Sequence, residues 1–198
     1  MSIKEFFYSL RWDWRMNFGL TFDRMRSMLL LLDIRYEQFI HRNFYRPKNP
    51  ISIIWYLTRF LGSIFQWFIA TSLIPGDAYI GRGLRLPHPQ NIIVSRLAHI
   101  GEFCTLYQNV SIGLNGFKPT EAPCIGDRVM LGTGSIVVGD ITIGSDVIIG
   151  VGAVILRSIP AHSRVFSPRP SVLTNHPSRN LAEPGSDEHI RDPYSIWR

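Results

Sequence analysis

A six-residue period runs through the middle of this 198-residue chain and constrains its fold more than any other feature. From Ile125 to Ile155 an aliphatic residue stands at every sixth position, and a glycine directly follows most of these residues. The aliphatic positions are Ile125, Leu131, Val137, Ile143, Ile149 and Ile155. The position four residues after each of the first five is small or β-branched. The same register runs earlier through Ile80, Leu86 and Ile92, and again through Ile100, Leu106 and Ile112.

Such a unit describes a short strand followed by a corner, because one aliphatic and one small side chain point inward and glycine permits the turn. Three units close a triangular coil, and stacked coils place like residues above one another with the backbone paired in parallel. About four to five coils fit between Ile74 and Pro160. The alternative is an ordinary parallel sheet with glycine turns, which does not by itself keep six units in register. The sequence therefore predicts a mainly β protein built as a parallel β-helix.

Aromatic residues and glycine divide the chain into three regions, which we place at residues 1–73, 74–160 and 161–198. Residues 1–75 hold 9 of the 12 Phe and 4 of the 5 Trp, and apolar spacing in 22–39 predicts a helix. We expect two or three helices there. Glycine concentrates in the second region, whereas the third is rich in proline and is typical of an extended, partly disordered tail. The ends of a β-helix expose unpaired strand edges, so the first region and the tail are expected to cap them.

Composition excludes several classes of protein. A mean hydropathy of +0.06 is too low for a polytopic membrane protein. The charge-free run at 60–74 is also shorter than the roughly 18 to 20 residues of a spanning helix. We recognise no secretory signal at the start, and two cysteines are too few for a disulfide framework, so a cytoplasmic protein is expected. The net charge of +6 lies mostly in the first region, but its arginines alternate with apolar residues, which disfavours nucleic-acid binding.

Three segments resemble one known family. They are Ile80-Gly-Arg-Gly-Leu-Arg-Leu-Pro-His88, Val110-Ser-Ile-Gly113 and the run from Ile125 to Gly134. Together with the repeat, they resemble the hexapeptide-repeat acyltransferases, within the serine acetyltransferase branch that also includes exopolysaccharide and capsule O-acetyltransferases. The resemblance covers about half of the chain, from Ile74 to about Val172. It implies a left-handed β-helix, a homotrimer and acetyl-CoA as the acyl donor.

His88 is the strongest catalytic candidate. It stands two residues after the inward Leu86 and between Pro87 and Pro89, so we expect its imidazole to be held at an outer corner of the coil. Transfer of an acyl group from a thioester to a hydroxyl needs a base that titrates near neutral pH. The resembled family uses the histidine of this motif in that role, whereas the alternative is a surface histidine without function. A backbone N–H around Gly113 is the candidate donor to the oxyanion.

The donor site is implied by the resemblance, which places acetyl-CoA along a groove between neighbouring subunits. Small residues that allow close approach of the pantetheine are Gly132, Thr133, Gly134, Ser135, Gly152 and Ala153. Arg157, Arg164 and Arg169 are candidates for the CoA phosphates, and a solvated surface role is the alternative for each.

The remaining histidines and cysteines carry weaker signals. His99 directly precedes the inward Ile100 and should face solvent, and we expect no metal site because zinc needs closely spaced ligands that the chain does not offer. His41, His162, His176 and His189 have no partner pattern. Cys104 falls on the small inward position and is expected in the core, whereas Cys124 has no assignable role.

The acceptor is where this chain departs from the serine acetyltransferase pattern. Counting from His88, an upstream aspartate of the family falls on Leu73, and an arginine-histidine pair falls on Glu121 and Ala122. An amino-acid acceptor would lose partners for its ammonium and carboxylate groups. We therefore expect a sugar hydroxyl as the acceptor, in exopolysaccharide or capsule synthesis. Serine is the alternative acceptor, and a non-catalytic β-helix scaffold is the alternative function.

The basic, aromatic N-terminal region bears on the location of this reaction. Residues 51–74 suit peripheral contact with the inner face of a membrane, and equally a cap that only packs the end of the trimer.

Overall fold

The computed structural model describes residues 1–44, 52–116 and 122–167. Three helices come first: α1 (Ile3–Asn17), α2 (Phe22–Phe44) and α3 (Ser52–Ala70). The expected helix at 22–39 is thus confirmed and extends to Phe44. Helix α1 begins with a capping box, in which the Ser2 hydroxyl accepts from the Glu5 backbone N–H and the Glu5 carboxylate accepts from the Ser2 N–H.

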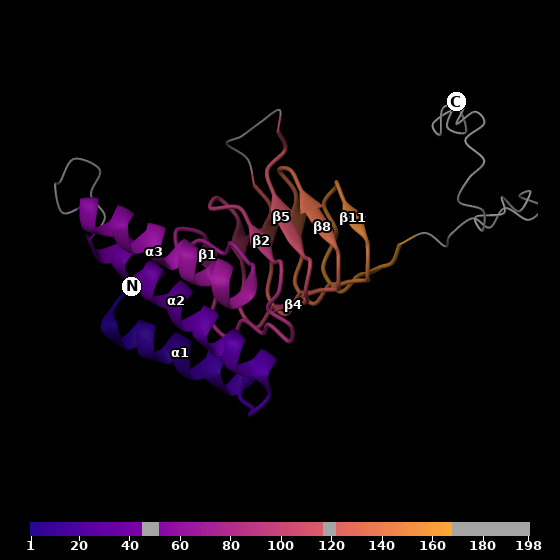
Figure 1. Ribbon diagram of the computed structural model, residues 1–198. Coiled ribbons are helices and arrows are strands. Elements are labelled where there is room, and N and C mark those ends of the chain that lie inside the picture. The colour runs from indigo at the N-terminus through magenta and orange to yellow at the C-terminus, as the bar shows by residue number, and fades with distance from the viewer. Residues whose placement is uncertain (45–51, 117–121, 168–198) are drawn as a thin grey trace, which may run out of the picture. The chain divides into compact units, whose positions relative to one another are not determined.

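Short parallel strands follow and form a coil with three faces (Figure 1). The first face consists of β1 (Tyr79–Ile80), β3 (His99–Ile100), β6 (Cys124–Ile125) and β9 (Thr142–Ile143). The second consists of β4 (Thr105–Leu106), β7 (Met130–Leu131), β10 (Ile148–Ile149) and β12 (Arg164–Val165). The third consists of β2 (Ile93–Val94), β5 (Ser111–Gly113), β8 (Ile136–Val138) and β11 (Val154–Ile155). The chain visits the faces in turn, and this left-handed parallel β-helix confirms the predicted fold class.

The repeat builds the core in the predicted register with one exception. Val94, and not the predicted Ile92, pairs with Ile112, so the two additional residues lie before this strand and not after it. Ile100 pairs with Ile125, and Ile125 pairs with Ile143, so that each aliphatic residue stacks on its equivalent in the next coil. All the predicted aliphatic positions are buried, and so are the small positions, including Cys104 and Ser135. Each buried aliphatic side chain contributes roughly 1.5 to 3 kcal/mol. The ladders therefore form one continuous hydrophobic core.

The helices cover the first coil with polar side chains. The Asn17 amide donates to Leu84 O at 2.8 Å and its oxygen accepts from Leu86 N–H at 2.9 Å. Arg35 donates to the carbonyls of Ile80 and Gly81. The opening strand edge thus receives partners for backbone groups that would otherwise be unpaired, which confirms the predicted capping role of the N-terminal region.

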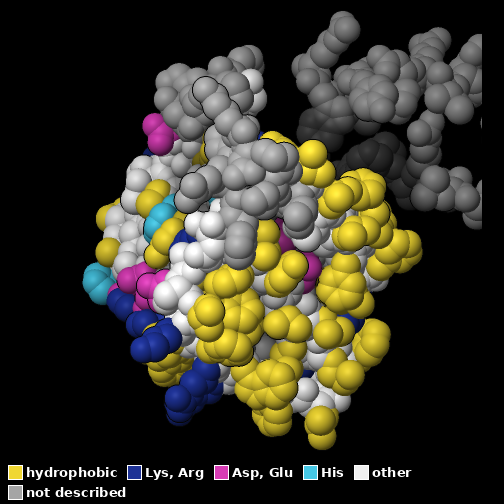
Figure 2. Space-filling model, turned by 90° about the vertical axis from the view of Figure 1, so that its left-hand side faces the viewer, with side chains coloured by type: hydrophobic (Ala, Val, Ile, Leu, Met, Phe, Trp, Pro, Cys, Tyr) yellow, Lys and Arg dark blue, Asp and Glu magenta, His cyan; other side chains and the backbone are white. Residues whose placement is uncertain are grey.

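Polar side chains of the helices are buried together with Leu30, Leu31 and Ile34, and many other apolar side chains of the helices are exposed. In α3 the buried residues include Gly62 and Gln66, whereas Phe60, Trp67 and Phe68 are exposed. Figure 2 shows apolar side chains gathered over much of this helical end of the molecule. Among the described residues, no helix has the length and apolar character needed to cross a membrane.

Candidate functional site

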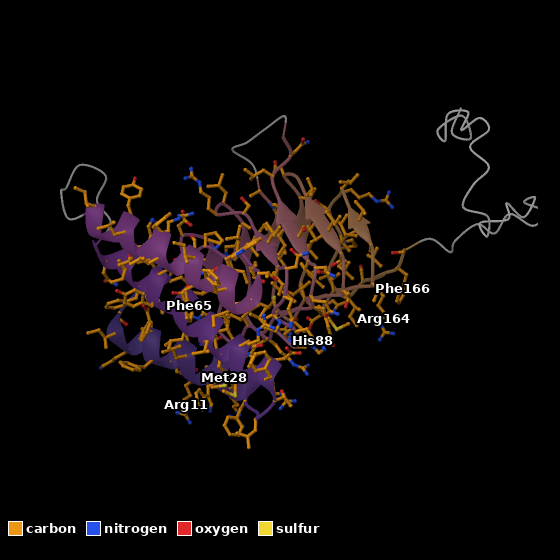
Figure 3. All side chains as sticks on the ribbon, viewed as in Figure 1. Arg11, Met28, Phe65, His88, Arg164 and Phe166 are labelled. Carbon is orange, nitrogen blue, oxygen red and sulfur yellow. The ribbon has the colours of Figure 1, made fainter. Side chains whose placement is uncertain are left out.

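His88 lies at the corner that follows Leu86, where the helical layer meets the first coil (Figure 3). Leu86 is buried in the core and Pro89 is also buried, so the short segment between them is held from both sides. The His88 side chain is half exposed. The predicted outward position is confirmed, and the imidazole is available to a substrate.

An aspartate from α2 orients this imidazole. Asp23 Oδ2 lies 2.8 Å from His88 Nδ1, and Asp23 Oδ1 accepts a hydrogen bond from the Gln90 amide at 3.0 Å. The hydrogen bond from His88 lowers the pKa of Asp23, and that from Gln90 lowers it further. An ionised Asp23 favours a proton on Nδ1, which leaves Nε2 with a free lone pair. The pair therefore has the arrangement of a general base and its orienting carboxylate.

A cavity of about 320 Å³ opens beside this pair. It is lined by Met16, Asn17, Thr21, Asp23, Arg24, Arg85, Leu86, Pro87 and His88. Two guanidinium groups thus accompany the Asp23–His88 pair, and they come from α2 and from the outward side of the first coil. The cavity combines a base with positive charge.

The second predicted catalytic group, Gly113, lies at a different corner. It ends β5, on the third face, whereas His88 lies in the turn that leads from the second face to the third. Within one chain the structure therefore does not bring the two together, and the role of Gly113 stays a prediction.

The predicted donor residues lie along the second face and its turns. Gly132 and Thr133 line a groove of about 520 Å³ together with Tyr107, Gly150 and Phe166. Gly134 and Gly152 adopt φ angles of +69° and +67°, which strain any residue with a Cβ. Ser135 and Ala153 are buried with the core. These two can offer a ligand only their backbone.

Two of the predicted phosphate-binding arginines share another groove. Arg157 and Arg164 line a hollow of about 580 Å³ with Leu156 and Phe166, near the last coils (Figure 3). Arg169 lies outside the described residues.

The other cysteine and histidine candidates that the structure describes lie in surroundings that give no sign of a catalytic role. Burial raises the pKa of the Cys104 thiol to about 11, which agrees with the expected core position and makes a thiolate nucleophile unfavourable. His99 faces outward as expected and stacks on Tyr79 with ring centroids 4.1 Å apart. Among the described residues, no group of three or more His, Cys, Asp and Glu is arranged to hold a metal ion. His176 and His189 lie outside the described residues.

Sequence reasoning missed the partners of His88. Asp23 stands 65 positions before His88, and no motif connects the two. The only available signal was an acidic residue at the start of a predicted helix, which ordinarily indicates a favourable interaction with the helix dipole. At the positions where the acceptor contacts were expected, Leu73 is exposed and bridges Ile93, Ala122 is partly buried, and Glu121 lies outside the described residues.

Comparisons with known proteins point to serine acetyltransferases. A serine acetyltransferase from Helicobacter pylori is 33% identical over 121 residues, which cover 61% of this chain and 70% of that protein. The solved soybean serine acetyltransferase apoenzyme has a TM-score of 0.70 at 21% identity, over 83% of this chain and 67% of that one. A solved serine acetyltransferase complex with CoA has a TM-score of 0.58 at 20% identity, over 72% of this chain and 54% of that one. No family model matches the chain.

Proposed function

The chain belongs to the serine acetyltransferase family, and on that premise we propose that it transfers the acetyl group of acetyl-CoA to the hydroxyl of serine. Family membership makes it an acyltransferase of the hexapeptide-repeat type, with acetyl-CoA as donor. The observation that carries the site assignment is the Asp23–His88 pair, which faces a cavity of suitable size. This pair also disfavours the alternative of a scaffold without catalysis.

The sugar acceptor expected from the sequence is wrong, and so is the associated role in exopolysaccharide or capsule synthesis. The relatives are serine acetyltransferases, which supports the alternative acceptor. The expectation rested on missing charged residues at Leu73 and Glu121–Ala122. It took no account of charged groups that α2 and the first coil bring to His88 through the tertiary structure.

The chain's own residues account for the proton transfers. His88 Nε2 takes the proton of the attacking hydroxyl, and Asp23 stabilises the resulting imidazolium through its hydrogen bond from Nδ1–H. The bound donor supplies an activated acetyl thioester. As the thioester bond breaks, His88 returns the proton to the departing sulfur. A base of this kind contributes roughly 100- to 10000-fold to the rate.

The residues along the second face fit such a donor. The groove at Gly132, Thr133 and Gly150 is lined by small residues, and Arg157 and Arg164 offer charge for phosphates in the neighbouring hollow. Gly134, Ser135, Gly152, Ala153 and Arg169 remain part of the proposed donor site.

A homotrimer is the proposed assembly. The third face carries outward apolar side chains at Ile93 and Val154, which are 46% and 57% exposed in the single chain. Packing of this face against a neighbour would remove that apolar surface from water. The same packing is the route by which His88 of one subunit could approach Gly113 of another. The expected cytoplasmic location stays a prediction, and the relatives give no support to peripheral membrane contact through residues 51–74.

The function is tested by following thiol release from acetyl-CoA with L-serine as acceptor. We expect serine-dependent release in the wild type and a loss of roughly 100- to 10000-fold in kcat for His88→Ala. CoA binding, measured by calorimetry, should be retained in this variant because His88 lies outside the donor groove.

The matched control is His99→Ala, which removes an outward histidine that lies on the first face, away from the His88 corner. Its activity should equal that of the wild type. Near-normal turnover in His88→Ala would exclude His88 as the base, and a wild type that releases no thiol with serine would exclude serine as the acceptor.

A further inference from the structure

The cavity beside His88 has an excess of positive charge. Its one carboxylate, Asp23, already accepts from His88 and Gln90, whereas Arg24 and Arg85 bring two guanidinium groups. Each guanidinium has five N–H donors. The cavity therefore favours an anionic group next to the catalytic base.

Arg85 is the more available of the two cations. It lies on the outward side of the first coil, where its backbone bridges Thr105, and its side chain is exposed. Within the described part of the chain, its guanidinium has no hydrogen bond or ion pair. Four other arginines of that part pair with carboxylates, namely Arg35, Arg59, Arg82 and Arg128.

Arg24 is partly engaged. One of its terminal nitrogens donates to Phe18 O at 2.7 Å, which fixes the side chain at the edge of the cavity and leaves other donors unused. Arg24 thus suits an assisting role, with Arg85 as the main contact.

Serine carries its carboxylate only a few bonds from its hydroxyl, so the base and the carboxylate partner must line the same small cavity. We propose that Arg85, assisted by Arg24, binds the acceptor carboxylate and so selects a hydroxy acid or amino acid as substrate. This assignment rests on the proposed function. It also supplies the cation that Glu121 and Ala122 do not provide at the position expected from the family. Paired N–H···O bonds from a guanidinium to a carboxylate supply both charge and geometry.

The test compares two acceptors in steady-state kinetics. L-Serine has the carboxylate, whereas L-serinamide keeps the hydroxyl and the ammonium but has no negative charge. Arg85→Gln should raise the KM for serine roughly 10- to 100-fold, as expected for a lost hydrogen bond to a charged group, and should leave kcat within about threefold. The kcat/KM for serinamide should be unchanged.

Arg96→Gln is the matched control, because Arg96 is an exposed arginine of the β-helix that does not line the cavity. It should alter neither acceptor's kinetics. Arg24→Gln should raise the KM for serine by less than Arg85→Gln does. Equal effects of Arg85→Gln on serine and serinamide, or no effect on either, would overturn the assignment while the proposed function stands.

A separate measurement decides the case in which the wild type acetylates neither acceptor. The proposed function would then be wrong, and calorimetric titration with L-glycerate, which has a hydroxyl and a carboxylate, tests the cavity directly. Wild-type binding that Arg85→Gln weakens at least tenfold supports a carboxylate site. No binding to the wild type, or equal binding to the variant, overturns it.

Discussion

In the β-helix the buried side chains are almost all aliphatic, whereas the helical layer buries polar side chains beside a few aliphatic ones, such as Leu30 and Ile34, and exposes many apolar ones. Ile125 and Val137 are typical of the β-helix, and Asp13, Arg35 and Gln38 are typical of the helical layer. The difference follows from what each region packs against. Inside the coil an aliphatic ladder meets its own repeat, but the helices meet the open edge of the first coil, which presents N–H and C=O groups.

The contacts of Asp13 show how this edge is satisfied. Its Oδ1 accepts from the backbone N–H groups of Gly83 and Leu84 at 2.8 and 3.1 Å, and Arg35 Nε donates to its Oδ2 at 2.7 Å. Buried backbone groups without partners are costly, so a polar helix surface is the favourable partner for a strand edge. The exposed apolar residues of the helices therefore follow in part from this capping.

Asp13→Ala should have the largest effect on the polar contacts between the helices and the first coil. It leaves the buried Arg35 charge without its carboxylate and two N–H groups without an acceptor, so we expect a loss of about 3 to 5 kcal/mol in the free energy of unfolding. Urea denaturation followed by circular dichroism measures it. Arg128→Gln removes a cation from the exposed Arg128–Asp146 pair and should leave stability unchanged. Equal effects of the two variants would contradict the capping role.

The aliphatic ladder is tested by Ile125→Ala. Ile125 is fully buried between Ile100 and Ile143, so the cavity should cost about 2 to 5 kcal/mol in the same denaturation experiment. Thr142→Ala, at an exposed position one residue before Ile143, serves as the control and should change stability by less than about 0.5 kcal/mol. A small effect of Ile125→Ala would mean that the coils collapse around the missing side chain.

The helical layer also contains a largely buried carboxyl group, that of Glu37, whose pKa is raised. Burial raises the pKa of Glu37 from 4.5 to about 7, while a hydrogen bond from Gly76 N–H opposes this shift. Between these two values the unfolded chain is ionised at Glu37 and the folded chain is protonated. Unfolding then releases a proton, so this contribution to stability is present below pH 4.5 and is lost as the pH rises to about 7.

Glu37→Gln should remove that pH dependence. Relative to the wild type, the variant should become more stable as the pH is raised from 5 to 8, by at most about 3 kcal/mol in the free energy of unfolding. Denaturation curves at the two pH values measure the difference. Glu102→Gln makes the same change at a partly exposed carboxylate that pairs with Arg82, and it should not reproduce the gain. A wild type and a Glu37→Gln variant that respond equally to pH would refute the assignment.

Much of the β-helix was predictable because its information is local and repeated. The pattern of each six-residue unit marks its inward positions, and the neighbouring units support the same register. Ile80 and Ile155 could therefore both be placed in the core. His88 was predictable for the same reason, since its motif is continuous with the repeat. The acceptor side of the site was not, because Asp23 and Arg24 reach His88 from a helix with no repeat to anchor its register.

The coil, its core and the corner position of His88 follow from the sequence alone, because a period of six with inward aliphatic residues packs well in only one way. The tertiary structure decided which polar side chains close the first coil, and it decided that Asp23 orients His88 beside Arg24 and Arg85. Those contacts depend on how helices dock onto an edge. Docking is set by hydrogen bonds between residues tens of positions apart, and no local pattern encodes it.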